Sequence, residues 1–194
     1  MDPLIQIHQP APDFELPDLM GVPHRLAGVQ GRVLVLNFWS SECPWAQRGD
    51  EVIAELKPVW GDRVELWSIA SNAIETDKQL ELAAAAREPG IVLRDAEHAV
   101  ADLYGAVTTP HFFVIDENGL LRYRGAPDDI SFRQREPTVH YLKDAVEALL
   151  NGREPNPAET WGIRLYNHPP RFLKRVPSAM DFPEQMSAAH TGQV

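Results

Sequence analysis

Cys43 is the residue whose type and place in the sequence most clearly predict covalent chemistry. It is the only cysteine among 194 residues, and it closely follows a largely apolar run, rich in Val and Leu, at residues 33–39. Pro44 comes next, and proline is favoured at the first position of a helix, where its missing N–H is not needed. A thiol at a helix start faces free backbone N–H groups and the positive end of the helix dipole, which both favour the thiolate. We therefore expect Cys43 to be a solvent-reachable nucleophile. The alternative is an inert, packed cysteine.

The residues around Cys43 suggest further roles. Ser40 could donate a hydrogen bond to the thiolate or simply close a turn. Glu42 opposes the thiolate, because an adjacent carboxylate disfavours a second negative charge. We expect Pro44 and Trp45 to lie where a substrate would dock, with packing as the alternative role for Trp45. The seven histidines show no metal-ligand spacing, so neither a metal nor another cofactor is expected.

The elements that must position Cys43 alternate between strand and helix. The run at residues 33–39 predicts a strand buried on both faces, and residues 64–70 predict a second. Residues 91–93 predict either a short strand or the lead-in to a short helix. Helices are expected from Pro44 to Gly61, over residues 74–87 and 96–104, and from Val139 to Asn151. Residues 14–26 and 111–124 suggest two hairpins, the second with an Asn-Gly turn. This order predicts an α/β domain with a mixed central sheet flanked by helices, and in such sheets the site lies at the carboxyl ends of the strands.

Composition limits the classes of function. A formal net charge of −10 argues against nucleic acid or an anionic membrane as the main partner. No apolar run approaches the roughly 18 residues of a membrane span, and the first residues lack a secretory signal, so a cytoplasmic protein is expected. Residues 1–152 are interpreted as one domain and residues 153–194 as an extended, proline-rich tail. A homodimer is left open.

Several motifs together resemble the thioredoxin superfamily. They are the segment Asn-Phe-Trp-Ser-Ser-Glu-Cys-Pro at residues 37–44, the Thr109-Pro110 pair before a Phe-Val-Ile-Asp strand, and the Asn118-Gly119 turn. The opening Ala-Pro-Asp-Phe-Glu-Leu at residues 11–16 looks like the peroxiredoxin branch, which contains alkyl hydroperoxide reductase and thiol-specific antioxidant, and the layout is most similar to its redoxin group. The resemblance implies a thioredoxin-like fold and a cis Pro110 that faces Cys43.

The same resemblance implies the remaining site residues. The backbone of Thr109 would pair with a docked substrate. An arginine from a distant strand would stabilise the thiolate and the departing oxygen, and Arg122 or Arg124 could supply it. His111 could also tune Cys43, although a half-buried strand histidine is the alternative.

The sequence also departs from these families. Ala46 stands where the second cysteine of a Cys-x-x-Cys motif would be, and Leu36 replaces the proline of the peroxiredoxin motif, while Ser40 keeps the hydroxyl of its threonine. Any resolving thiol must therefore be external. The first expectation is a one-cysteine peroxidase whose Cys43 reduces a hydroperoxide and is regenerated from the sulfenic acid by glutathione or a thioredoxin. A monothiol–disulfide oxidoreductase and a non-catalytic binding module are the alternatives.

Overall fold

The computed structural model describes residues 5–29, 31–131 and 133–160. Within them, the helices and strands follow one another in the alternating order that the sequence predicts. In chain order they are β1 (Glu15–Pro17), β2 (Pro23–Arg25), η1 (Leu26–Val29), β3 (Val33–Trp39), α1 (Pro44–Trp60), η2 (Gly61–Arg63), β4 (Val64–Ala70), α2 (Asp77–Arg87), β5 (Ile91–Arg94), α3 (Ala99–Tyr104), β6 (His111–Ile115), β7 (Leu121–Gly125) and α4 (Tyr141–Leu150).

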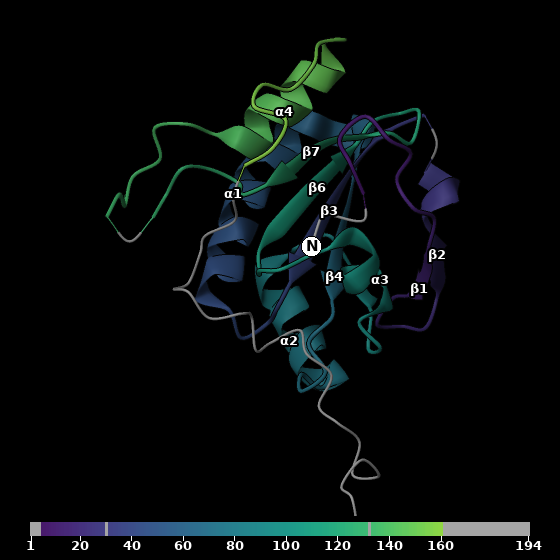
Figure 1. The fold of residues 1–194 in the computed structure, drawn as a ribbon. Coiled ribbons are helices and arrows are strands. Elements are labelled where there is room, and N and C mark those ends of the chain that lie inside the picture. Colours follow the sequence, from purple (N-terminus) through teal and green to yellow (C-terminus); the bar gives the residue numbers. More distant parts are fainter. Residues whose placement is uncertain (1–4, 30, 132, 161–194) are drawn as a thin grey trace, which may run out of the picture.

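A mixed sheet forms the centre of the fold, with its strands in the order β5-β4-β3-β6-β7 (Figure 1). β3 pairs in parallel with β4 and antiparallel with β6, so it is the middle strand. All seven of its residues are buried, as expected for a continuous Val/Leu run covered on both faces. β3 therefore delivers Cys43 to the carboxyl end of the sheet, beside the start of β6.

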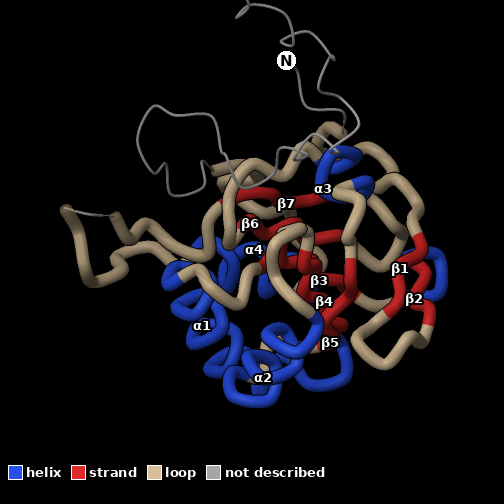
Figure 2. The backbone as a smooth tube through the Cα atoms, turned by 90° about the horizontal axis from the view of Figure 1, so that it is seen from below, coloured by secondary structure: helices blue, strands red, loops and turns tan. Residues whose placement is uncertain are grey.

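Helices cover the two faces of the sheet unequally (Figure 2). On one face, Val33 and Val35 of β3 pack with residues of α1 and α4 such as Ile53 and Leu142. On the other face, Leu34, Leu36 and Phe38 pack with Tyr104 of α3 and with Phe14 of the N-terminal segment. Because neighbouring strand residues point to opposite faces, one strand contributes to both halves of the core.

Three predicted helices begin later than the sequence indicates. α2 begins at Asp77, after a capping box between Thr76 and Gln79, rather than at residue 74. α3 begins at Ala99, although Asp95 still accepts hydrogen bonds from the N–H groups of Val100 and Ala101, as a capping carboxylate does. α4 begins at Tyr141, so Val139 precedes it. In each case the apolar pattern in the sequence starts a few residues before the backbone becomes helical.

The beginning of the predicted tail lies against the sheet. The N–H of Arg124 donates to the carbonyl of Ala158, and the N–H of Thr160 donates to the carbonyl of Arg124, so residues 158–160 run beside β7. The rest of the predicted tail, residues 161–194, lies outside the described part of the chain. None of the helices described is long and apolar enough to cross a membrane.

Candidate functional site

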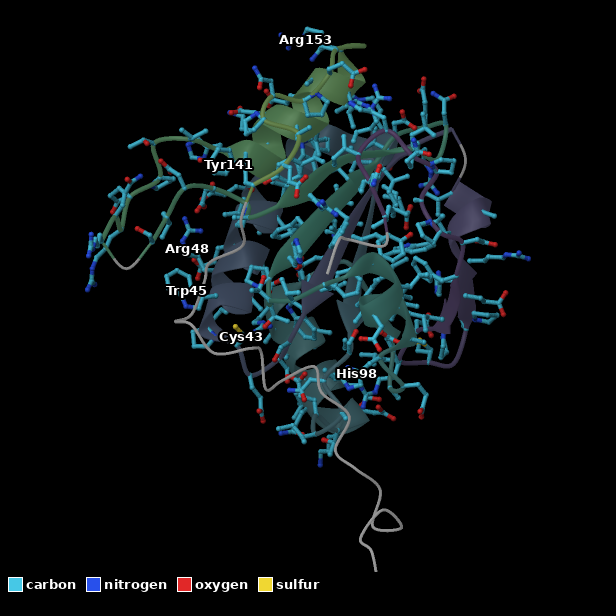
Figure 3. All side chains as sticks on the ribbon, viewed as in Figure 1. Cys43, Trp45, Arg48, His98, Tyr141 and Arg153 are labelled. Atoms are coloured by element: carbon cyan, nitrogen blue, oxygen red, sulfur yellow. The ribbon has the colours of Figure 1, made fainter. Side chains whose placement is uncertain are left out.

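Cys43 occupies the N-cap position of α1, and Pro44 is the first helical residue. Its backbone is extended, with φ −86° and ψ 118°, and its half-buried side chain makes no capping hydrogen bond. Figure 3 shows Cys43, Trp45 and Arg48 following one another along the beginning of this helix. The thiol therefore lies where the free N–H groups of a 17-residue helix favour negative charge.

The thiol lies against the peptide segment that precedes β6. Cys43 Sγ donates a hydrogen bond to the carbonyl oxygen of Thr109 at 3.1 Å, and the Thr109–Pro110 peptide bond is cis, as the resemblance implies. This hydrogen bond uses the proton of the thiol and places the sulfur between the start of α1 and the backbone that precedes β6. Binding of a substrate to the Thr109 backbone stays a prediction.

Residues 40–42, which we call the cysteine turn, connect β3 to Cys43 and are held by one buried carboxylate. Glu75 Oε1 accepts hydrogen bonds from the hydroxyls of Ser40 (3.1 Å) and Ser41 (2.5 Å) and from the N–H of Glu42 (3.1 Å). Glu75 comes from the connection between β4 and α2 and is only 1% exposed. The polar groups of the cysteine turn are thus fixed from a part of the chain more than 30 residues away.

Arg87, the last residue of α2, holds the cysteine turn from its carbonyl side. Its guanidinium donates to the carbonyls of Ser40 (3.0 Å) and Ser41 (3.2 Å) and lies over the Trp39 ring, 4.7 Å from the centroid. Its Nε also pairs with the Asp50 carboxylate at 2.9 Å. The sequence offered no motif for either Glu75 or Arg87, because each is a charged residue in an ordinary polar setting.

Asp50, on α1, is the buried acid beneath this arrangement. Its carboxylate also accepts from the indole N–H of Trp39 at 3.0 Å. Burial disfavours the charged form and raises the pKa of Asp50 to about 6, although the Trp39 hydrogen bond and the Arg87 charge act in the opposite direction. Asp50 therefore titrates within the ordinary experimental range of pH.

The structure directs the Ser40 hydroxyl to Glu75, not to the thiol. Ser40 Oγ also accepts a hydrogen bond from the N–H of Glu42 at 3.3 Å, which is the turn-closing role that the sequence left as an alternative. The Glu42 carboxylate, which opposes a thiolate by its charge, accepts a hydrogen bond from Gln79 of α2 at 3.1 Å. The Ser40 hydroxyl is therefore bound to the connection that leads into α2, and the Glu42 carboxylate is bound to α2 itself.

Arg122 and Arg124 bind groups other than Cys43. Arg122 pairs with Asp116 at 3.4 Å and with Glu154. Arg124 donates to the carbonyl of Ile5 at 2.9 Å and to Glu159 at 2.7 Å, and it lies opposite Phe113, three residues beyond Pro110. Antiparallel pairing of β7 with β6 places both arginines alongside β6 residues that lie beyond its first residue, and each binds other partners there. These contacts give no support to the prediction that one of them activates the thiol.

Pro44 and Trp45 follow the thiol on α1, and His111 follows Pro110 on β6; docking of a substrate at Pro44 and Trp45 stays a prediction. Pro44 is exposed and Trp45 is half-buried on the first turn of α1. His111 is buried at the start of β6, where burial, followed by the charge of Arg124, lowers its pKa to about 4. Its Nδ1 accepts from the N–H of Val107 at 3.4 Å, so the ring is neutral at physiological pH. Tuning of Cys43 by His111 stays a prediction.

Ala46 replaces a second thiol at a fully buried position. It is 0% exposed and packs among Trp39, Ala70 and Leu80, with Cys43 at the edge of the same cluster. Among the described residues, no group of three His, Cys, Asp or Glu side chains comes together as metal ligands would. The site therefore consists of one thiol at a helix start, a cis-proline segment facing it, and a turn fixed by two charged residues.

Comparisons with known proteins agree with this geometry. The sequence model of the AhpC/TSA family matches residues 7–124. The chain is 32% identical over 122 residues to the thiol-disulfide oxidoreductase ResA of Geobacillus thermodenitrificans, covering 61% of this chain and 68% of that one. It is similar to the crystal structure of the hypothetical protein SMc02350 of Sinorhizobium meliloti, with a TM-score of 0.74, 30% identity, and coverage of 82% of this chain and 92% of that one.

A more distant structure supports the fold alone. A secreted disulfide oxidoreductase of Mycobacterium tuberculosis matches with a TM-score of 0.55 and 18% identity over 72% of this chain and 95% of that one. The architecture is therefore shared by proteins whose sequences have diverged widely.

Proposed function

Since the chain belongs to the AhpC/TSA family, within the thioredoxin-like superfamily, and keeps one cysteine at the start of α1, we propose that it is a monothiol–disulfide oxidoreductase. In the first step, the Cys43 thiolate attacks one sulfur of a disulfide, forms a mixed disulfide and releases the other sulfur as a thiolate. In the second step, an external thiolate attacks the mixed disulfide, forms a new disulfide and returns Cys43 as a thiolate. Glutathione or a thioredoxin would supply that external thiol.

The observation that carries the proposal is the hydrogen bond from the Cys43 thiol to the backbone carbonyl of Thr109, the residue before the cis-proline, together with alanine at the position of a resolving cysteine. The half-buried sulfur is 3.1 Å from the Thr109 carbonyl, so a disulfide that reaches the sulfur must pass beside this backbone. Ala46 offers no second sulfur to expel the partner from the mixed disulfide. The adduct is therefore expected to persist until an external thiol arrives. The 32% identity to a protein named thiol-disulfide oxidoreductase supports the same reaction class.

Peroxide reduction, the first expectation from the sequence, receives less support from the site. Breaking an O–O bond requires hydrogen-bond donors or a cation beside the sulfur, where charge develops. The sequence predicted that Ser40, Arg122 or Arg124 would supply such a donor. Instead, Ser40 donates to Glu75, Arg122 pairs with acidic side chains, and Arg124 donates to an acidic side chain and a backbone carbonyl. A disulfide requires less from its surroundings, because its leaving group is a sulfur that carries negative charge well.

The test compares the wild type with Cys43→Ser, using oxidised glutathione and hydrogen peroxide as separate substrates. We expect intact-protein mass spectrometry to show one glutathionyl group on the wild type and none on the variant, with release of the group by added dithiothreitol. We expect hydrogen peroxide to oxidise Cys43 no faster than it oxidises free cysteine. Rapid peroxide consumption without a mixed disulfide would establish the peroxidase instead. A Cys43 inert toward both reagents would leave a non-catalytic module.

A further inference from the structure

We propose that Glu75 is a positioning residue for Cys43, which aligns the thiol for disulfide exchange by holding the cysteine turn. The inference rests on the proposed thiol–disulfide function and names a residue that acts in it without touching the substrate. Glu75 is suited to the task because its carboxylate contacts all three residues between β3 and Cys43. Glu42, whose N–H it accepts, is the immediate neighbour of Cys43.

The burial of Glu75 shows how strongly the turn is held. A carboxylate that is 1% exposed carries a large desolvation cost unless donors surround it, and here two hydroxyls and one N–H converge on Oε1. Breaking these hydrogen bonds would leave the buried Ser40 hydroxyl without its acceptor, which costs more than losing an exposed contact. Among the described residues, Oε2 of Glu75 has no hydrogen-bond partner. All the hydrogen bonds that the carboxylate accepts are therefore made by Oε1, with the cysteine turn.

Glu75 is itself fixed to the end of β4. The guanidinium of Arg94 donates to the carbonyl of Glu75 at 3.0 Å and to the carbonyls of Ala70 and Asn72 at 3.2 Å. The connection from β4 to α2 therefore has a set position relative to the sheet, and through Glu75 so has the cysteine turn. Arg87 completes this support from the carbonyl side of the turn.

Alignment matters for disulfide exchange more than for simple alkylation. Thiol–disulfide exchange requires the sulfur to approach the disulfide in line, while the substrate lies beside the Thr109–Pro110 segment. A displacement of about 1 Å at a reacting atom can lower the rate by up to about 100-fold. A small, undocked reagent such as iodoacetamide samples many approaches to the thiolate. Loss of Glu75 should therefore slow exchange selectively, whereas a general disruption of the site would change both reactions together.

The experiment compares Glu75→Ala and Glu75→Gln with the wild type in the full chain. Two rate constants are measured for Cys43: formation of the mixed disulfide with oxidised glutathione, and alkylation by iodoacetamide. We expect Glu75→Ala to slow disulfide formation at least about tenfold and to change alkylation less than about threefold. Glutamine keeps an acceptor oxygen of the same reach, so Glu75→Gln should restore disulfide formation to within about threefold of the wild type. Glu81→Gln, at an exposed glutamate on the α2 helix that follows Glu75, is the matched control and should behave as the wild type.

Backbone hydrogen exchange tests the contact independently of function. The Glu42 amide should exchange at least about tenfold faster in Glu75→Ala and remain slow in Glu75→Gln. If Glu75→Ala does not fold, Ser41→Ala removes one of the three donors and should show the same selective slowing to a smaller degree. The proposal is overturned if the ratio of the two Cys43 rates is unchanged in the folded variant, or if glutamine fails to rescue it. A wild type that forms no mixed disulfide refutes the proposed function, and the Glu42 exchange then decides whether Glu75 holds the turn.

Discussion

Replacing Arg87 with methionine tests whether the buried pair beneath the cysteine turn stabilises the fold. Arg87 pairs with Asp50 at 2.9 Å, donates to the carbonyls of Ser40 and Ser41, and lies over the Trp39 ring. The Asp50 side chain is only 2% exposed, so removal of the guanidinium leaves a charge buried beside apolar groups. Methionine fills similar space without donating a hydrogen bond, so the change isolates the polar contacts.

The expected cost follows from these contacts. Removing one partner of a buried pair typically costs about 3–5 kcal/mol, because the other charge is left uncompensated. The total stability of a domain of this kind is about 5–15 kcal/mol, so the loss is readily measured. At pH 8, where the Asp50 carboxyl is charged, we expect Arg87→Met to lose about 3–5 kcal/mol. The loss should shrink at pH 5. There Asp50, whose pKa is already raised to about 6, takes up a proton more readily without the Arg87 charge.

The assay is urea unfolding followed by far-UV circular dichroism, with the free energy extrapolated to zero denaturant. Asp50→Asn combined with Arg87→Met should be more stable at pH 8 than Arg87→Met alone, because an amide can still accept from the Trp39 indole and carries no charge. Lys78→Met, which removes an exposed cation from the same α2, is the control and should change stability by less than about 0.5 kcal/mol. The reasoning is refuted if Arg87→Met costs less than about 1 kcal/mol at pH 8. A loss equal at pH 5 and pH 8, and unrelieved by Asp50→Asn, would refute it equally.

Two further predictions concern His111 and Ala46. Because burial lowers the pKa of His111 to about 4, below the unfolded value of about 6.5, the unfolded chain binds a proton first as pH falls, and stability from this group is lost between about pH 7 and pH 4. His111→Phe should flatten that part of the urea-unfolding profile, and an unchanged slope would contradict the assignment. Ala46→Cys places a second thiol one helical turn after Cys43, at a packed position where overfilling costs about 1–3 kcal/mol. If the variant folds, its glutathione adduct should be at least about tenfold less abundant by mass spectrometry, because the new thiol can expel glutathione. An equally persistent adduct would show that alanine at this position does not explain the monothiol behaviour.

The local frame of the site could be predicted from the amino-acid sequence. Because apolar residues occupy both alternating sets of positions in residues 33–39, a strand there must be buried on both faces. Pro44 favours a helix start directly after Cys43. These features depend on side-chain hydrophobicity and backbone restriction within a few residues, so they predicted β3, the beginning of α1 and the carboxyl-end placement of the thiol. The cis bond at Thr109–Pro110 followed from resemblance, since proline alone indicates only that a cis bond is accessible.

The polar contacts of the cysteine turn, and those of the two candidate arginines, depend on the tertiary structure. Ser40 lies three residues before Cys43, yet its hydroxyl binds Glu75, and Arg122 and Arg124 bind Asp116, Glu154, the Ile5 carbonyl and Glu159. Glu75 and Arg87 reach the cysteine turn across more than 30 residues of sequence, because parallel pairing of β3 with β4 brings the connection to α2 beside that turn. A hydrogen bond depends on distance and direction between groups that the chain brings together only on folding, and no local pattern records that choice.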